Sequence, residues 1–262
     1  MASEIFEKII EDKKKEIEID KRFFPLSSFK HKISNSEKDY IDALSSKRTG
    51  LIAEIKPKSP SRGFIRRSIN IKDIIDAYET RAQCISVLTD SKYFGGSLKL
   101  LQLASDYSRL PVLRKDFIID EYQIYQARLF GADAVLLIAS LLSVEDIKKF
   151  LEISRSLGMA CQVEIHNQSD LDKVLQTDAK LIAINNRDLK TMKKDVNTTI
   201  ELSKKIPKDK IRISESGINN NECLRRVAPY IDVVHIGSAF MEADDIKKKI
   251  KEIVGEKNEA KH

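Results

Sequence analysis

Short runs of apolar, mostly β-branched residues recur along the chain, and amphipathic stretches separate them. The runs cover residues 51–55, 84–88, 111–113, 134–138, 160–165, 181–184, 211–213 and 233–236. Between them, apolar residues recur at helical spacing, as at Ile71, Ile74, Ile75 and Tyr78. Strands that alternate with helices predict βαβ units and a parallel sheet. Eight such units favour an α/β fold of the closed (β/α)8 type, a single TIM barrel, over an open doubly wound sheet.

The segment before the first run is longer than a minimal barrel requires. Ile5, Ile9, Ile10 and Ile17 lie roughly on one stripe of an expected first helix. We therefore expect residues 1–48 to form a helical extension that covers the barrel mouth. The polar residues 257–262 are expected to fray. A barrel of this class needs about 250 residues, so residues 1–262 are interpreted as one domain.

The composition is globular, with 42% hydrophobic and 33% charged residues. Its apolar runs are shorter than the roughly 18 residues that cross a bilayer, and the Glu/Lys-rich start is unlike a signal peptide. We expect a cytoplasmic protein without a membrane partner. The formal charge is +6, but Lys and Glu alternate closely along the chain, which indicates solvated surface and predicts no nucleic-acid partner.

Cysteine and histidine spacing predicts no metal site. The three cysteines, Cys84, Cys161 and Cys223, lie far apart and form no CxxC pair. The four histidines show neither HExxH nor any other paired spacing. The glycine fingerprint of dinucleotide binding is likewise missing after the first run. We expect neither a metal nor a cofactor.

Polar residues stand where several apolar runs end. They are Glu54, Lys56, Lys115, Glu164, Asn185 and Arg187. In a parallel barrel these ends meet at one rim, where ligands bind. A lone pair such as Glu54 and Lys56 would be more typical of a structural salt bridge. Charged groups at so many ends are a costly way to build a core. Because neighbouring lysines lower each other's pKa and carboxylates oppose that shift, we expect general acids and bases near neutral pH.

Glycine–serine pairs follow the last two runs. Ser216 and Gly217 follow the seventh run, and Gly237 and Ser238 follow the eighth. Barrels commonly bind phosphate in these two loops through backbone N–H groups. Each pair alone would be interpreted as part of an ordinary turn. Their occurrence in both of these loops predicts a phosphate site.

With these motifs in hand, the sequence resembles the indole-3-glycerol phosphate synthase family of tryptophan biosynthesis. The similar segments occur in the family's order and spacing. They are AEIKPKSPSRG (53–63), ISVLTDSKYFGGS (85–97), PVLRKDFIIDEYQIYQARLFGADAVLLIA (111–139), QVEIH (162–166), INNRDL (184–189), SESGI (214–218) and IGSAFM (236–241). The resemblance implies a carboxy-lyase that converts 1-(2-carboxyphenylamino)-1-deoxyribulose 5-phosphate into indole-3-glycerol phosphate, carbon dioxide and water. The substrate is anionic through both its carboxylate and its phosphate.

The resemblance also implies roles for individual residues. Lys115 is the general acid on the ribulose carbonyl, Lys56 assists proton transfer, Glu54 serves the later dehydration, and Glu164 is a further carboxylate near the reacting atoms. The implied substrate-binding residues are Ser59, Phe94, Phe117, Leu136, Asn185, Arg187 and Leu189. The implied phosphate-binding residues are Ser216, Gly217, Gly237 and Ser238.

Other interpretations stay open at this point. Phosphoribosylanthranilate isomerase or a sugar-phosphate isomerase would also be a phosphate-binding barrel. These classes lack the combination of Glu-x-Lys with Lys-Asp-Phe that residues 54–56 and 115–117 form. A non-catalytic phosphate-ligand binder or a scaffold subunit is the alternative from another class. A weak association with other tryptophan-pathway enzymes is also left open.

Overall fold

Eight parallel strands form a closed barrel in the computed structural model, which describes residues 2–45, 49–188 and 191–255. The strands are β1 (Gly50–Ile55), β4 (Cys84–Leu88), β5 (Val112–Lys115), β6 (Ala134–Ile138), β7 (Ala160–Ile165), β8 (Leu181–Asn185), β9 (Ile211–Glu215) and β10 (Val233–Ile236). They pair in chain order, and β10 closes the ring against β1. The predicted TIM barrel is confirmed.

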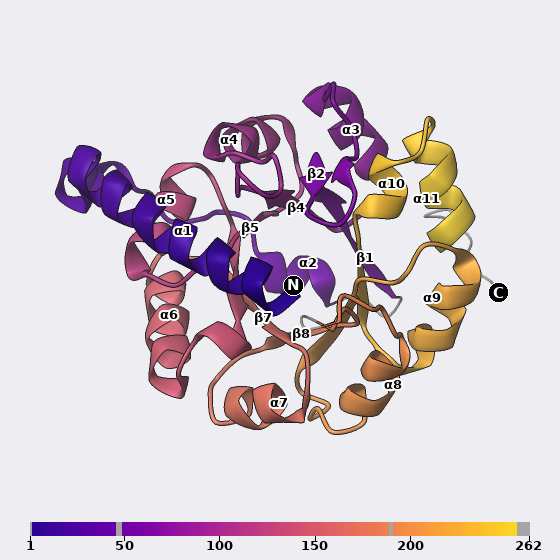
Figure 1. Ribbon diagram of the computed structural model, residues 1–262. Helices are drawn as coiled ribbons and strands as arrows, with labels where there is room; N and C mark the ends of the chain where they lie inside the picture. Colours follow the sequence, from indigo (N-terminus) through magenta and orange to yellow (C-terminus); the bar gives the residue numbers. More distant parts are fainter. Residues whose placement is uncertain (1, 46–48, 189–190, 256–262) are drawn as a thin grey trace.

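Helices surround the barrel and connect its strands (Figure 1). They are α3 (Ile71–Tyr78), α4 (Leu98–Tyr107), α5 (Glu121–Leu129), α6 (Val144–Ser156), α7 (Gln168–Val174), α8 (Asn197–Ser203), α9 (Asn221–Val227), α10 (Ser238–Met241) and α11 (Ile246–Val254). A short hairpin of β2 (Lys58–Ser59) and β3 (Gly63–Phe64) follows the first strand. Within the described ranges, every helix is too short or too polar to cross a membrane.

The strands extend further into polar sequence than the apolar runs predict. The third, sixth and seventh runs continue as strand through Lys115, Asn185 and Glu215. Backbone pairing sets these ends, because Lys115 pairs with Leu88 and Asn185 pairs with Glu215 across neighbouring strands. Strand hydrogen bonds use main-chain groups only, so a polar side chain does not end a strand.

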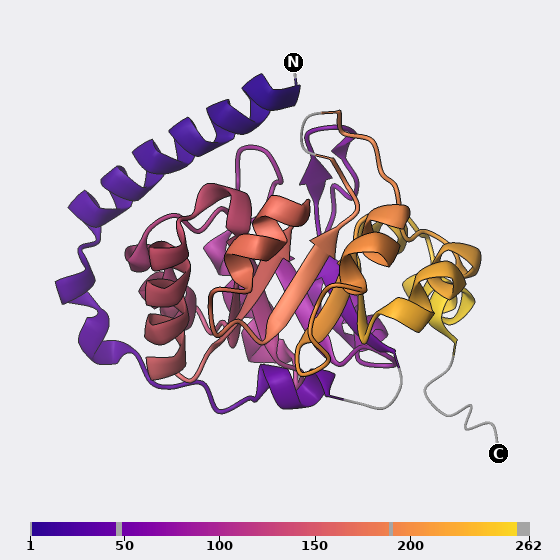
Figure 2. The ribbon, with the colours of Figure 1, turned by 90° about the horizontal axis from the view of Figure 1, so that it is seen from below.

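The N-terminal segment contributes two helices at opposite ends of the barrel (Figure 2). Helix α1 (Ala2–Phe23) lies across the end of the barrel where the carboxyl termini of the strands lie. Helix α2 (Tyr40–Leu44) closes the other end. In α2, Tyr40 and Leu44 are buried against inward residues such as Ile52 and Leu113. These contacts seal the bottom of the barrel, so its open end is the mouth beneath α1.

Helix α1 is held to the barrel by a buried charge as well as by apolar contacts. Its inner face buries Ile9, Lys13 and Ile17, which recur every four residues. The Lys13 ammonium lies 3.1 Å from the Asp116 carboxylate and 3.3 Å from that of Asp90. Burying a lysine is costly unless it is paired, so these two aspartates fix the position of the helix over the mouth.

Candidate active site

Inward-facing side chains change from apolar to polar along the strands, toward the mouth. Five strands show this change, in the pairs Ile52 and Glu54, Leu113 and Lys115, Ala183 and Asn185, Ile213 and Glu215, and Val233 and His235. On β7 both inward residues are polar, Gln162 and Glu164. Side chains two residues apart share a strand face. The same alternation that fills the lower barrel with apolar groups therefore brings the polar groups together on the floor of a cavity of about 480 Å³.

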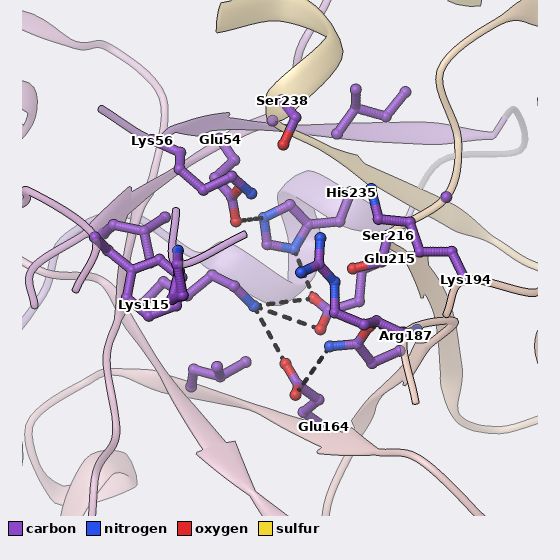
Figure 3. A pocket seen from close by; sticks show the side chains of 18 of the residues that line it. Glu54, Lys56, Lys115, Glu164, Arg187, Lys194, Glu215, Ser216, His235 and Ser238 are labelled. Atoms are coloured by element: carbon purple, nitrogen blue, oxygen red, sulfur yellow. Dashed lines mark hydrogen bonds and ion pairs between the residues drawn. The ribbon is translucent and has the colours of Figure 1, made fainter. Parts of the chain in front are cut away.

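Lys115 is the centre of this floor (Figure 3). Its ammonium lies 3.2 Å from Glu164 Oε2 and 3.3 Å from Glu215 Oε2. Burial opposes the charge, but the carboxylates of Glu215 and Glu164 outweigh burial and raise the pKa of Lys115 well above its ordinary value. The expectation of general acids and bases near neutral pH is therefore wrong for Lys115 in the free site, because nearby carboxylates dominate over any effect of Lys56. These contacts favour the protonated form of Lys115.

The two carboxylates beside Lys115 differ in their affinity for a proton. Although burial opposes its ionisation, Lys115 holds the pKa of Glu164 well below the ordinary value. Burial and the Glu164 charge raise the pKa of Glu215. A pair of carboxyl groups whose pKa values are pushed apart is typical of a site that moves protons.

Glu54 and Lys56 form a second charged pair at the end of β1. The Lys56 ammonium donates to Glu54 Oε1. Burial opposes ionisation of Glu54, but Lys56 and His235 outweigh it and lower its pKa to about 2. The side chain of Glu54 lies directly over Gly237, where an added Cβ would be 2.8 Å from the Glu54 Cβ. Gly237 therefore makes room for the Glu54 carboxylate, in addition to its predicted role toward phosphate.

Glu164 is held from the side away from Lys115 as well. Asn185 Nδ2 donates to Glu164 Oε1 at 3.1 Å, and His166 Nε2 lies 3.1 Å from the same oxygen. Burial opposes the charge on His166, but Asp170 and Glu164 outweigh it and raise its pKa to about 10. Three cationic or donor groups therefore keep the Glu164 carboxylate ionised and in place.

An apolar wall rises on one side of the charged floor. Phe94 and Phe117 lie with their ring centroids 6.0 Å apart, and Leu136 lines the cavity beside them. Helix α1 completes the wall with Phe6, whose ring meets that of Phe117 edge-on at 6.1 Å, and with Ile9. A flat aromatic ligand fits such a wall, because ring pairs favour offset or edge-on contacts.

The opposite side of the cavity is made of the two glycine–serine loops. Ser216 and Gly217 both adopt positive φ, 64° and 80°. That conformation costs a non-glycine residue on the order of 1–3 kcal/mol. Asn186 compensates at Ser216, because its buried amide donates to the Ser216 carbonyl at 2.9 Å. Gly237 and Ser238, at the start of α10, line the same side.

Basic residues lie above these loops at the rim. Arg187, Lys194 and Arg62 line the cavity, and Arg62 is paired with Glu242. Burial and the nearby Arg187 and Arg62 lower the pKa of Lys194. Mutual repulsion among cations is relieved when an anion binds between them. The cavity therefore combines a side suited to an anion, an aromatic wall and a floor of paired acidic and basic groups.

Comparison with known proteins agrees with this geometry. A family model described as indole-3-glycerol phosphate synthase matches residues 6–253. The chain belongs to the indole-3-glycerol phosphate synthase family. It is 40% identical over 253 residues to the indole-3-glycerol phosphate synthase of Legionella pneumophila, covering 95% of this chain and 98% of that protein. The protein of the same name from Acetivibrio thermocellus is 41% identical over 257 residues, covering 95% and 98%.

A third relative from this family is longer. The tryptophan biosynthesis protein TrpCF of Helicobacter pylori is 41% identical over 253 residues, which cover 96% of this chain and 55% of that protein. The chain thus spans about half the length of the TrpCF relatives that it matches.

The site expected from resemblance to the indole-3-glycerol phosphate synthase family lies largely in one cavity. The residues that line it are Glu54, Lys56, Phe94, Lys115, Phe117, Leu136, Glu164, Asn185, Arg187, Ser216, Gly217, Gly237 and Ser238. Ser59 does not line it, since its side chain is buried in β2, next to Pro60, which does. Leu189 lies outside the described residues, as do residues 257–262.

Sequence reasoning missed several residues of this cavity. Glu215 and His235 occupy the floor, Lys194 and Arg62 the rim, and Phe6 the wall. The alternation along the strands carried a signal for Glu215 and His235, because each follows an inward apolar residue by two positions. Phe6 had no such signal, since its role depends on how α1 crosses the mouth.

Proposed function

We propose that this chain converts 1-(2-carboxyphenylamino)-1-deoxyribulose 5-phosphate into indole-3-glycerol phosphate, carbon dioxide and water. One observation carries the proposal: a protonated lysine, Lys115, is held by two buried carboxylates at the bottom of a cavity with an aromatic wall and an anion-binding side. Family membership supports the same reaction. The substrate has the matching parts, a benzoate ring, a ketone and a phosphate.

Ring closure requires an acid at the ketone oxygen. A ring carbon of the anthranilate attacks the ribulose carbonyl carbon, and the carbonyl electrons move to oxygen. Lys115 stabilises the developing alkoxide by its charge and then gives it a proton. The high pKa of Lys115 ensures that this proton is present at neutral pH. The wall of Phe94, Phe117 and Leu136 presses the ring toward the carbonyl, which lowers the entropic cost of the attack.

Decarboxylation and dehydration follow from the same intermediate. The carbon–carboxylate bond breaks, and its electron pair returns to the ring, which becomes aromatic again. The new hydroxyl then leaves as water after it receives a proton, while a base takes a proton from the neighbouring carbon. Lys56 and Glu54 supply an acid and a base as an adjacent pair at the end of β1. Lys115 then takes a proton back from solvent, and the negative charges of Glu164 and Glu215 favour that uptake.

The phosphate serves as an anchor far from the reacting carbon. Backbone N–H groups at Ser216, Gly217, Gly237 and Ser238 and the rim cations are suited to a dianion. Binding energy from this remote group orients the ketone over Lys115. The aromatic wall and the anion-binding side lie on different sides of the cavity, so only one orientation satisfies both.

The test is turnover of the synthetic carboxyphenylamino-deoxyribulose phosphate by the purified, chelator-treated protein. We expect the fluorescence of the indole product to grow with time and to match release of carbon dioxide mole for mole. A folded protein that binds the compound without product formation would overturn the enzyme and support a phosphate-ligand binder or scaffold. Product formation only after metal is restored would overturn the acid–base mechanism.

A further inference from the structure

His235 is a buried histidine that the reaction scheme above does not use. It lies on β10 in register with Glu215 on β9 and with Ile52 on β1, and it lines the cavity floor. Only 4% of its surface is exposed. It thus stands between the two strands that carry Glu54 and Glu215.

The two ring nitrogens of His235 face different carboxylates (Figure 3). Nδ1 lies 3.1 Å from Glu215 Oε2, and Nε2 lies 3.6 Å from Glu54 Oε2. The Nε2 atom is fully buried, and within the described residues it makes no hydrogen bond at this separation. An ionised carboxylate only accepts hydrogen bonds, so a proton on Nδ1 would point at Glu215, while Nε2 faces Glu54 without a hydrogen bond.

Two polar side chains lie beneath the ring. Gln162 Nε2 lies 3.3 Å from the ring's Nδ1 and 3.4 Å from Glu215 Oε2, and the Tyr40 hydroxyl donates to Gln162 Oε1 at 3.3 Å. Tyr40 belongs to α2, the helix that closes the bottom of the barrel. A chain of contacts therefore runs from the closed end to the floor of the cavity.

We propose that His235 is a positioning residue that holds the carboxylates of Glu54 and Glu215 from opposite edges of one imidazole ring. This proposal rests on the proposed function and adds a residue to it. The ring fixes the distance between the carboxylate that serves dehydration and the carboxylate that favours proton uptake by Lys115. A proton on Nδ1 also favours the ionised form of Glu215, which is the form that accepts a proton.

Loss of the ring predicts a specific kinetic change. The groups around it are Glu54 from β1, Glu215 from β9, Lys115 from β5, and Gln162 and Tyr40 beneath. Without a proton on Nδ1, the pKa of Glu215 rises further, because a hydrogen bond to an ionised carboxylate favours that form. In a plot of kcat against pH, the fall of kcat on the acidic side therefore moves to higher pH. Substrate contacts at the wall and the phosphate loops stay in place, so KM stays close to wild type.

The experiment compares His235→Leu, His235→Gln and the control Tyr40→Phe. We expect His235→Leu to lower kcat on the order of tenfold to hundredfold, since small misplacements of catalytic groups cost that much. His235→Gln keeps one N–H donor and should recover part of the loss and part of the pH shift. Tyr40→Phe removes a hydroxyl from the same layer without touching a carboxylate, and it should keep the wild-type kcat profile.

Each result decides the proposal. An unchanged kcat and an unchanged acidic side of the kcat profile in His235→Leu, or an equal loss in Tyr40→Phe, would overturn it. If His235→Leu does not fold, the test rests on His235→Gln, which should still show a partial shift of the acidic side of the kcat profile. No shift in His235→Gln would overturn the proposal as well. Nitrogen-15 spectra of the ring give a test without substrate: we expect a proton on Nδ1, and a bare Nδ1 would refute the contact even in a protein that shows no turnover.

Discussion

Replacing Lys115 by methionine tests the proposed acid most directly. The substitution keeps a similar volume and removes the cation that lies 3.2 Å from Glu164 and 3.3 Å from Glu215. A positioned general acid contributes roughly 10²–10⁴-fold to rate. At about 1.4 kcal/mol for each tenfold, Lys115→Met is therefore expected to raise the activation free energy by about 3–5 kcal/mol. Substrate affinity should change little, because the wall and the anion-binding side remain.

The same substitution also destabilises the fold. Glu164 and Glu215 are left buried without the cation between them, and removing one partner of a buried ion pair costs about 3–5 kcal/mol. Their repulsion then raises a carboxyl pKa above the unfolded value of about 4.3. The folded variant binds an extra proton, so its stability rises as pH falls toward that value. Urea unfolding at pH 5.5 and 7.5 should show a smaller deficit at pH 5.5.

The assay separates these two effects. Single-turnover product fluorescence, with protein in excess over substrate, reports chemistry, and calorimetric titration of the substrate reports binding. Lys149→Met is the matched control, because Lys149 lies on the outer surface of α6, where it pairs with Glu121 at 2.7 Å. It should keep wild-type turnover. A folded Lys115→Met protein that turns over within tenfold of wild type would refute Lys115 as the acid.

Three further substitutions follow from the geometry. Arg187→Ala should raise KM on the order of tenfold and leave kcat nearly unchanged in steady-state kinetics, because its guanidinium lies at the rim. Gly237→Ala should lower kcat while circular dichroism stays native, because the new Cβ would lie 2.8 Å from the Glu54 Cβ and displace that side chain. Lys13→Met should cost about 3–5 kcal/mol in urea unfolding at pH 7. Burial opposes ionisation of Asp116, but Arg114 and then Lys13 outweigh it and lower its folded pKa to about 2. The part that Lys13 contributes is present above the unfolded value of about 3.9 and is lost as pH falls, so the deficit should shrink toward pH 3.

Hydrophobic periodicity was sufficient to predict the barrel, because its strands are buried on both faces. Each strand is therefore a continuous run of apolar residues in the sequence, and the position of the run predicts the position of the strand. The floor residues followed from where these runs end, as with Lys115 and Glu164. The ends themselves were underestimated by one or two residues, since strand pairing continues through polar side chains.

Contacts between elements far apart in sequence could not be predicted in this way. The pairing of Lys13 with Asp90 and Asp116 depends on the angle at which α1 crosses the mouth, and no local pattern encodes that angle. Lys13 instead looked like one more charge on a solvated helix. Phe6 joins the aromatic wall for the same reason. His235 was considered only as a metal ligand, although its position on an inward strand face was a better guide.

The charges on the cavity floor neutralise one another before any substrate binds, because Lys115 pairs with Glu164 and Glu215. An ammonium has three N–H donors, and Glu164 and Glu215 engage Lys115 on one side. A ketone oxygen can take a remaining donor without breaking either ion pair, so the acid needs no rearrangement when substrate arrives. After Lys115 gives up its proton, the site holds three carboxylates beside a neutral amine, and their repulsion favours immediate uptake of another proton. The carboxylates that make Lys115 a poor acid in the free protein are therefore the groups that reset it after each turnover.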